Sequence, residues 1–122
     1  MTLPMLNRAQ VQRFDQVAIK NYGIPEIVLM ENAARGVVDT VQESVAYLQS
    51  LGHGQEAIKI SVICGGGNNG GDGYAIARHL HISGFIVKVF ALSDPKRLLG
   101  SAKFNRRITE EMKLACVDIL MT

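Results

Sequence analysis

The residues best suited to chemistry stand in one nine-residue stretch, 65–73, which holds six glycines together with Asn68, Asn69 and Asp72. Glycine can adopt a positive φ and can bring its backbone N–H groups close to a ligand. The two amides and the carboxylate add hydrogen-bond acceptors. We therefore expect this stretch to bind a polar ring, a ribose or a hard cation.

Two kinds of phosphate site share part of this pattern. Gly65, Gly67 and Gly70 have the G-x-G-x-x-G spacing of dinucleotide-binding domains, and Asp94 stands where such domains place an acid for the ribose. However, Asp72 would repel a phosphate brought close to it. A P-loop is excluded because no Lys-Ser or Lys-Thr follows the glycines. An NAD-dependent oxidoreductase domain that depends on Asp94 stays open as an alternative.

A purely structural interpretation of the stretch is also open. Asn68 and Asn69 would then adopt left-handed turn conformations, and Asp72 would cap the helix that follows. We expect Asp72 to cap this helix whatever else it does. Capping alone does not explain why so many glycines surround it.

Apolar periodicity predicts which elements position the stretch. Residues 58–64 have the composition of a buried strand, and a right-handed crossover makes the strand at 85–92 its parallel neighbour. The predicted helices are 8–21, 25–49, 72–82 and a segment ending near 114, and the strands are 58–64, 85–92 and 117–121. This order predicts an α/β fold: a three-layer Rossmann-like parallel sheet with two N-terminal helices, in a single domain over residues 1–122.

The composition limits the partners and the compartment. Thirteen basic and eleven acidic residues give a formal charge of +2, which does not argue for nucleic acid or an anionic membrane. No apolar run reaches the roughly 20 residues of a membrane span, and residues 1–10 lack the apolar core of a signal peptide. Cys64 and Cys116 form no CxxC pair, so we expect reduced core thiols in a cytoplasmic protein.

The stretch lies within a longer motif that resembles a known family. Residues 64–80, Cys-Gly-Gly-Gly-Asn-Asn-Gly-Gly-Asp-Gly-Tyr-Ala-Ile-Ala-Arg-His-Leu, closely resemble the motif of the YjeF-type N-terminal domain of the NAD(P)H-hydrate epimerase family. Residues 29–34, Leu-Met-Glu-Asn-Ala-Ala, resemble the second-helix motif of that family. Arg13, Asp15 and residues 22–25 are similar to its opening segment.

The resemblance implies a function in nucleotide repair. Members of the family interconvert the R and S epimers of NADH and NADPH that are hydrated at C6 of the nicotinamide ring. By this resemblance, the hydrated nucleotide binds to Asn68, Asn69, Gly70, Gly71 and Asp72, and Asn69 is also one ligand of a potassium ion. The family's further ligands would lie beyond Thr122, so the chain resembles the family domain without its C-terminal part. The resemblance does not identify the group that moves the proton or hydroxyl.

Two polar pairs elsewhere have more than one interpretation. Glu31 and Asn32 interrupt an apolar helix, either at an exposed edge or, by the resemblance, with Asn32 facing the glycine-rich stretch. His79 and His81 stand two apart on a predicted helix and point in different directions. We expect both histidines on the surface rather than at a metal.

A group of basic residues precedes and enters the last predicted helix, and it consists of Lys96, Arg97, Lys103, Arg106 and Arg107. Such a group can form a phosphate-binding face. Glu110 and Glu111 are close enough to neutralise part of the charge, so we expect a solvated helix.

A non-catalytic role is the second hypothesis for function. Domains of this type also serve as nucleotide-binding or protein-interaction scaffold modules in larger proteins. Three parallel strands with an uncovered edge favour association with another copy. We therefore expect a homodimer that binds a small-molecule nucleotide.

Overall fold

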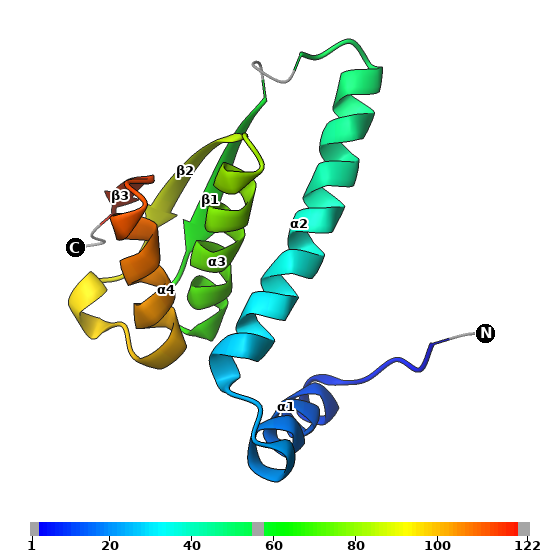
Figure 1. The fold of residues 1–122 in the computed structure, drawn as a ribbon, viewed down its shortest axis with the longest axis vertical. Coiled ribbons are helices and arrows are strands. Elements are labelled where there is room, and N and C mark those ends of the chain that lie inside the picture. Colours follow the sequence, from blue (N-terminus) through cyan, green and yellow to red (C-terminus); the bar gives the residue numbers. More distant parts are fainter. Residues whose placement is uncertain (1–2, 55–57, 120–122) are drawn as a thin grey trace.

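The computed structural model describes residues 3–54 and 58–119 and shows helices on one side of a small sheet (Figure 1). The chain begins with α1 (Arg8–Tyr22) and α2 (Glu26–Ser50). The remaining elements are β1 (Lys59–Cys64), α3 (Asn68–Ile82), β2 (Ile86–Ala91), the 3₁₀ helix η2 (Pro95–Arg97), α4 (Gly100–Glu111) and β3 (Ala115–Asp118). This succession confirms the predicted α/β fold.

Local sequence explains both ends of α1. The Asn7 Oδ1 atom accepts a hydrogen bond from the Gln10 backbone N–H at 2.9 Å, and the Gln10 side chain accepts one from the Asn7 N–H at 2.8 Å. This capping box satisfies N–H groups that a helix start leaves without partners. Gly23 ends the helix with a φ of 68°, a left-handed conformation that glycine adopts at little cost.

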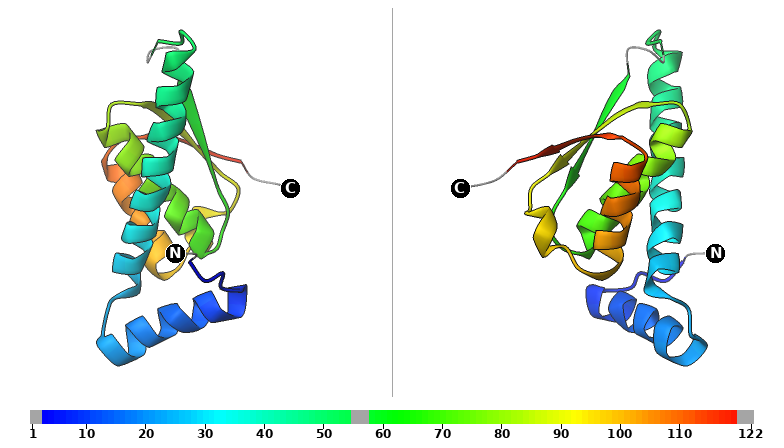
Figure 2. Two further views of the ribbon diagram at one scale, coloured as in Figure 1. Left: turned by 90° about the vertical axis from the view of Figure 1, so that its right-hand side faces the viewer. Right: turned by 60° about the vertical axis from the view of Figure 1, so that its left-hand side comes forward.

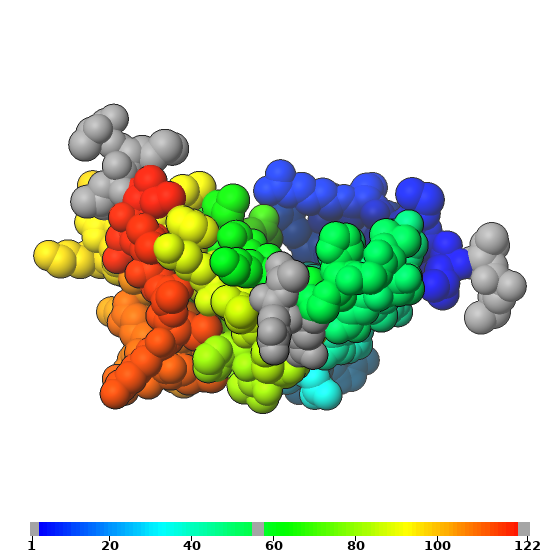
Figure 3. Space-filling model, turned by 90° about the horizontal axis from the view of Figure 1, so that it is seen from above, coloured from blue at the N-terminus to red at the C-terminus, as the bar shows by residue number. Residues whose placement is uncertain are grey.

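The three strands are parallel and lie in the order β1-β2-β3. α3 connects β1 to β2, and α4 connects β2 to β3. Consecutive right-handed crossovers in one direction place their helices on the same face of a sheet. Figure 2 shows α2, α3 and α4 together on that face. In the space-filling view of Figure 3, β3 (red) and α2 (cyan-green) lie on opposite sides of the molecule.

The described chain forms two of the three predicted layers, because its helices do not cover the other face of the sheet. Ile63 of β1 and Ile86 of β2 are 67% and 52% exposed there. The buried core between sheet and helices consists of Val38, Cys64, Tyr74, Ala77, Leu80, Val87, Val89, Ala91, Leu98, Ala102 and Leu114. Burial raises the pKa of the Cys64 thiol to about 12, and Cys64 and Cys116 are both free, as expected for core thiols.

The last helix and strand differ from the prediction. α4 ends at Glu111 rather than near residue 114, and β3 begins at Ala115 rather than at 117. Between them Lys113 has a φ of 57°, which breaks the helix and turns the chain toward the sheet. Residues 120 and 121 of the predicted strand lie outside the described residues. In the part of the chain that the structure describes, no helix combines the length and the apolar character that crossing a membrane requires.

Candidate functional site

The polar residues of the glycine-rich stretch form the first turns of α3. The helix begins at Asn68, earlier than predicted, and its N-cap Gly67 provides no side-chain hydrogen bond. Asp72 therefore lies inside the helix, and the prediction that it caps α3 is wrong. The purely structural interpretation also fails for Asn68 and Asn69, because both are helical and neither has the left-handed conformation that it requires. Spacings of three and four residues instead place these side chains on one face of α3.

The glycines of the stretch allow α3 to pack closely against its neighbours. A Cβ on Gly70 would fall on the carbonyl oxygen of Gly65. A Cβ on Gly71 would stand 2.8 Å from the Cε atom of Met30 in α2. All of residues 65–73 are described, and none of their glycines has a positive φ. The expectation that these glycines supply positive φ is therefore wrong. A side chain is excluded by close packing at Gly70, Gly71 and Gly73, whereas a Cβ on Gly65 or Gly67 would meet nothing within 4 Å.

Asn68, Asn69 and Asp72 line a pocket of about 630 Å³ between α1, α2 and α3. Figure 1 shows α1 below the lower ends of α2 and α3. The other lining residues come from α1 and the first turns of α2, and they are Val11, Gln12, Asp15, Gln16, Ile19, Glu26, Leu29, Met30 and Ala33. The structure thus brings together three of the five predicted ligand residues, while Gly70 and Gly71 are buried and do not line the pocket.

The α1 wall of the pocket was not predicted. Gln12, Asp15, Gln16 and Ile19 recur at steps of three and four residues, so they form one face of the helix. That polar face was visible in the sequence as a stripe. The sequence does not show which element this face contacts. No residue of α1 is fully buried, so the helix carries only a weak apolar signal for a packing partner.

The lining of the pocket is acidic. Asp15, Glu26 and Asp72 contribute carboxylates, and no lysine or arginine occurs among the described residues that line it. Partial burial raises the pKa of the Asp72 carboxyl, and the charge of Asp15 raises it further. A partly desolvated acidic pocket disfavours a phosphate and suits an uncharged polar group or a cation.

The oxygens of Asn68, Asn69 and Asp72 also fit the chemistry of an alkali cation, which favours hard oxygen ligands. Within residues 3–54 and 58–119, no group of three His, Cys, Asp or Glu side chains is placed to hold a metal ion. The three carboxylates of the pocket therefore do not form a metal cluster. The fitting donors are the two amide oxygens on the first turn of α3, with Asp72 beside them.

Asp94, which the oxidoreductase alternative requires, does not line this pocket. Its Oδ1 atom accepts a hydrogen bond from the Lys96 backbone N–H at 3.0 Å and caps η2. The Asp94 carboxylate therefore has a structural role after β2, and this geometry gives no support to the oxidoreductase alternative.

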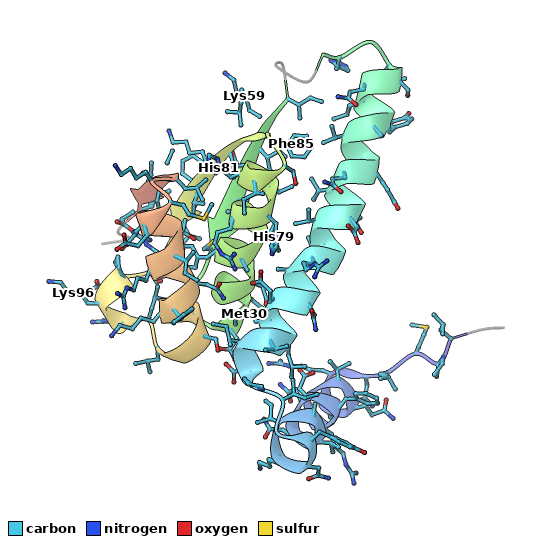
Figure 4. All side chains as sticks on the ribbon, viewed as in Figure 1. Met30, Lys59, His79, His81, Phe85 and Lys96 are labelled. Atoms are coloured by element: carbon cyan, nitrogen blue, oxygen red, sulfur yellow. The ribbon has the colours of Figure 1, made fainter. Side chains whose placement is uncertain are left out.

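Glu31 connects α2 to α3 rather than standing at an exposed edge. Its carboxylate oxygens lie 2.5 Å from Arg78 Nη2 and 2.6 Å from His79 Nε2. Burial alone would raise the pKa of Glu31, but the hydrogen bonds to Arg78 and His79 outweigh it and lower the pKa. Figure 4 shows His79 on the side of α3 that faces α2. The predicted surface position is thus wrong for His79, whereas His81 is exposed as predicted.

Asn32 does not face the glycine-rich stretch. It is exposed and borders a hollow of about 350 Å³ together with Arg78 and Phe104. The prediction that Asn32 braces the stretch is therefore wrong. Met30 occupies that place, because its side chain covers the backbone of Gly71.

Arg106 is buried, although the sequence predicts a solvated basic group. Its guanidinium donates hydrogen bonds to Asp118 at 2.9 Å, to the Tyr74 hydroxyl at 3.3 Å and to Glu110 at 2.7 Å. The pairing with Glu110 confirms the predicted neutralisation. The burial was not predictable from α4 alone, because Asp118 comes from β3.

A second hollow, of about 620 Å³, lies along the opposite side of α1, and its lining is largely apolar. It is lined by Leu6, Gln10, Arg13, Phe14, Val17, Ala18, Tyr22 and Ile24. None of these residues belongs to the stretch at 65–73 or to the motif at 29–34. The pocket beside α3 is therefore the candidate site.

Comparison with known proteins decides the family. The family model described as YjeF-related protein N-terminus matches residues 26–118, from the start of α2 to the end of β3. The chain belongs to the YjeF-related N-terminal family. Both motifs that carry the resemblance lie within the matched residues, while the α1 wall of the pocket precedes them.

Relatives within the YjeF-related family show how much of a longer protein the chain matches. It is 40% identical over 109 residues to the bifunctional NAD(P)H-hydrate repair enzyme Nnr of Moorella thermoacetica, covering 88% of this chain and 19% of the relative. It is 34% identical over 110 residues to the NAD(P)H-hydrate epimerase of Rhodopirellula baltica, covering 90% of this chain and 41% of the relative. The chain thus spans less than half the length of these relatives.

A solved structure supports the fold of the YjeF-related chain. The crystal structure of yeast ynu0 superposes on this chain with a TM-score of 0.79 and 25% sequence identity. The match covers 95% of this chain and 47% of the yeast chain. This likeness agrees with the Rossmann-like α/β arrangement of the parallel sheet and its helices.

Proposed function

We propose that the pocket beside α3 is the nucleotide site of an NAD(P)H-hydrate epimerase. The observation that carries the proposal is that Asn68, Asn69 and Asp72 of the family-like motif share one face of α3 and line a pocket of about 630 Å³, within the usual size of ligand sites. Relatives named for NAD(P)H-hydrate epimerisation and repair support it. The ligand of this chain is then hydrated NADH or NADPH, and the reaction of the family domain is the interconversion of its R and S epimers.

The acidic lining favours the uncharged hydrated ring and its ribose over the pyrophosphate. The amides of Asn68 and Asn69 both donate and accept hydrogen bonds, which suits a carboxamide and hydroxyl groups. Asp72 has a raised pKa and is the group of the motif best suited to exchange a proton with a hydroxyl. The first N–H groups of a helix have no partner within the helix, so those at the start of α3 offer further donors to the oxygens of the carboxamide and the ribose.

We propose in addition that Asn69 is one ligand of a potassium ion, with the oxygens of Asn68 and Asp72 beside it. A bound potassium ion supplies positive charge to the acidic pocket. The amide oxygens would face the cation, and the amide NH₂ groups would stay available to donate hydrogen bonds to the nucleotide.

A thermal-shift titration with NADPH hydrate tests the proposed function. We expect the ligand to raise the melting temperature, with a further rise when potassium replaces a bulky organic cation. Asn69→Ala removes the potassium-dependent part. Asn32→Ala is the matched control, because this asparagine is exposed on α2 outside the pocket. An unchanged melting temperature at saturating NADPH hydrate, with or without potassium, contradicts the proposal.

The exposed face of the sheet supports a second candidate function, a module that binds another protein chain. Ile63, Ile86 and Val117 on the three strands are 67%, 52% and 39% exposed. Apolar surface that spans neighbouring strands favours association, and we propose a homodimer. Light scattering tests it: we expect the mass of two chains, and Ile86→Lys should return the mass of one. A wild-type mass of one chain removes this candidate without affecting the nucleotide site.

A further inference from the structure

The middle of α4 carries a buried polar side chain that the proposed function does not use. Asn105 has no exposed surface. Its Oδ1 atom accepts a hydrogen bond from Arg78 Nη2 at 3.0 Å, and its Nδ2 atom donates to Met30 Sδ at 3.0 Å. Burying an amide costs free energy that a leucine in the same place would not cost. Its presence points to a requirement for an oriented polar group between α2, α3 and α4.

Arg78 fixes the direction in which this amide points. A guanidinium can only donate hydrogen bonds, and Arg78 Nη2 is held by Glu31 Oε2 at 2.5 Å. The oxygen of Asn105 must therefore face Arg78, which turns the NH₂ group toward Met30. The orientation of Asn105 thus follows from the ion pair between α2 and α3.

Met30 contacts both Asn105 and the helix α3 that lines the candidate site. Its Sδ and Cε atoms lie 2.9 Å and 2.8 Å from the point where a Cβ on Gly71 would stand, so the end of the side chain covers the backbone of α3. The same side chain lines the pocket with Asn69 and Asp72. Figure 4 shows Met30 near the beginning of α2. Methionine is unbranched and adaptable, so a hydrogen bond to its sulfur restricts where its terminal methyl group lies.

We propose that Asn105 is a positioning residue for the nucleotide site. By holding the sulfur of Met30 it seats that side chain on Gly71, and so it fixes the turn of α3 that carries Asn69 and Asp72. The identity of the ligand rests on the proposed function, whereas the contacts from Asn105 to Gly71 do not. The sequence motifs do not include Asn105, because its burial depends on the packing of α4 against two other helices.

Asn105→Asp separates this role from general stability. The carboxylate keeps an acceptor for Arg78 and pairs with its charge, but it has no NH₂ group to donate to Met30. Thr109→Val is the matched control, because Thr109 is also buried on α4 and its hydroxyl donates to the backbone oxygens of Asn105 and Tyr74, its only partners among the described residues. The measurements are amide hydrogen exchange at residues 70–72 and the dissociation constant for NADPH hydrate.

We expect Asn105→Asp to speed amide exchange at residues 70–72 and to weaken NADPH hydrate binding about fivefold, the factor that one neutral hydrogen bond provides. Thr109→Val should change neither quantity, whatever it does to the melting temperature. In a Met30→Leu background, Asn105→Asp should have no further effect, because the sulfur is absent.

The positioning role is overturned if Asn105→Asp has the same amide exchange rates at residues 70–72 and the same dissociation constant as the wild type. It is also overturned if Thr109→Val changes both quantities as much as Asn105→Asp does. If the wild-type chain does not bind NADPH hydrate, the proposed function fails instead. The exchange rates at residues 70–72 then decide the positioning role without the ligand.

Discussion

In the C-terminal half of α3, Arg78 and His79 both reach Glu31 of α2, so each charged group meets a partner at hydrogen-bond distance. In the N-terminal half, Asp72 shares its pocket with Asp15, and no hydrogen bond from the described residues lowers its pKa. One helix therefore has a paired half that joins α2, α3 and α4 and an unpaired half that borders a hollow. Paired polar groups hold the fold together. The unpaired carboxylates remain for a ligand to satisfy.

Gly70→Ala should have the largest effect on stability, because it places a side chain against the backbone in the unpaired half of α3. The new Cβ would fall on the carbonyl oxygen of Gly65 and lie 2.8 Å from its carbonyl carbon. Backbone atoms cannot move aside as a flexible side chain does, so we expect a loss of about 3 kcal/mol or more in unfolding free energy. Urea denaturation followed by circular dichroism measures it.

Gly67→Ala is the control for this prediction. A Cβ on Gly67 meets no atom within 4 Å, and its φ of −98° suits any residue. We expect a loss of no more than about 1 kcal/mol, because alanine is a poorer N-cap than glycine but its Cβ meets no atom. Similar losses for Gly67→Ala and Gly70→Ala would mean that close packing does not explain the glycines of this half.

The sequence predicts the elements of the fold well because their signals are local. The capping box of Asn7 and Gln10 is complete within one turn, and the strand at 59–64 is rich in β-branched apolar residues and leads directly to the motif. Three of the five residues that the resemblance names line one pocket, and their binding of a nucleotide stays a prediction.

What the sequence could not predict depends on contacts between distant segments. The burial of Arg106 requires Asp118, a residue of another element. Asp15 enters the pocket only because α1 lies across the ends of α2 and α3. In each case a polar residue gains its role from a tertiary partner.

Glu31→Ala should have the second largest effect, because it removes the common partner of the paired half. The Arg78 side chain is only 12% exposed, so it would keep a poorly solvated charge beside Asn105. We expect a loss of about 2 kcal/mol at pH 7, below the range for fully buried pairs because the Glu31 side chain is 33% exposed. Urea denaturation measures the loss.

The pH dependence gives this substitution a second readout. The pKa of Glu31 is lowered in the folded state, so its stabilisation is present above its ordinary value of 4.5 and is lost as the pH falls through the lower folded value. The difference between wild type and Glu31→Ala should therefore shrink at acidic pH. Glu43→Ala, an exposed change on the same helix, should cost little at any pH. A constant difference across pH would show that Glu31 acts by packing rather than by charge.

Asp72→Asn should have the smallest effect on stability, and it should stabilise the fold where the other substitutions destabilise it. The pKa of Asp72 is raised by burial and by Asp15, so the folded chain holds this proton more tightly than the unfolded chain does. Ionised Asp72 therefore lowers stability above its folded pKa, and this cost disappears as the pH falls below its ordinary value of 3.8. We expect Asp72→Asn to raise the melting temperature at pH 7 and to leave it unchanged near pH 3.

Asp15→Asn should give part of the same gain, because it removes the second cause of the raised pKa and leaves the burial. Asp39→Asn, an exposed substitution on α2 outside the pocket, is the control and should leave the melting temperature unchanged. If Asp72→Asn instead lowers the melting temperature at pH 7, the carboxylate has a stabilising partner in the folded chain. The unpaired half of α3 would then resemble the paired half, because its charge would already be satisfied without a ligand.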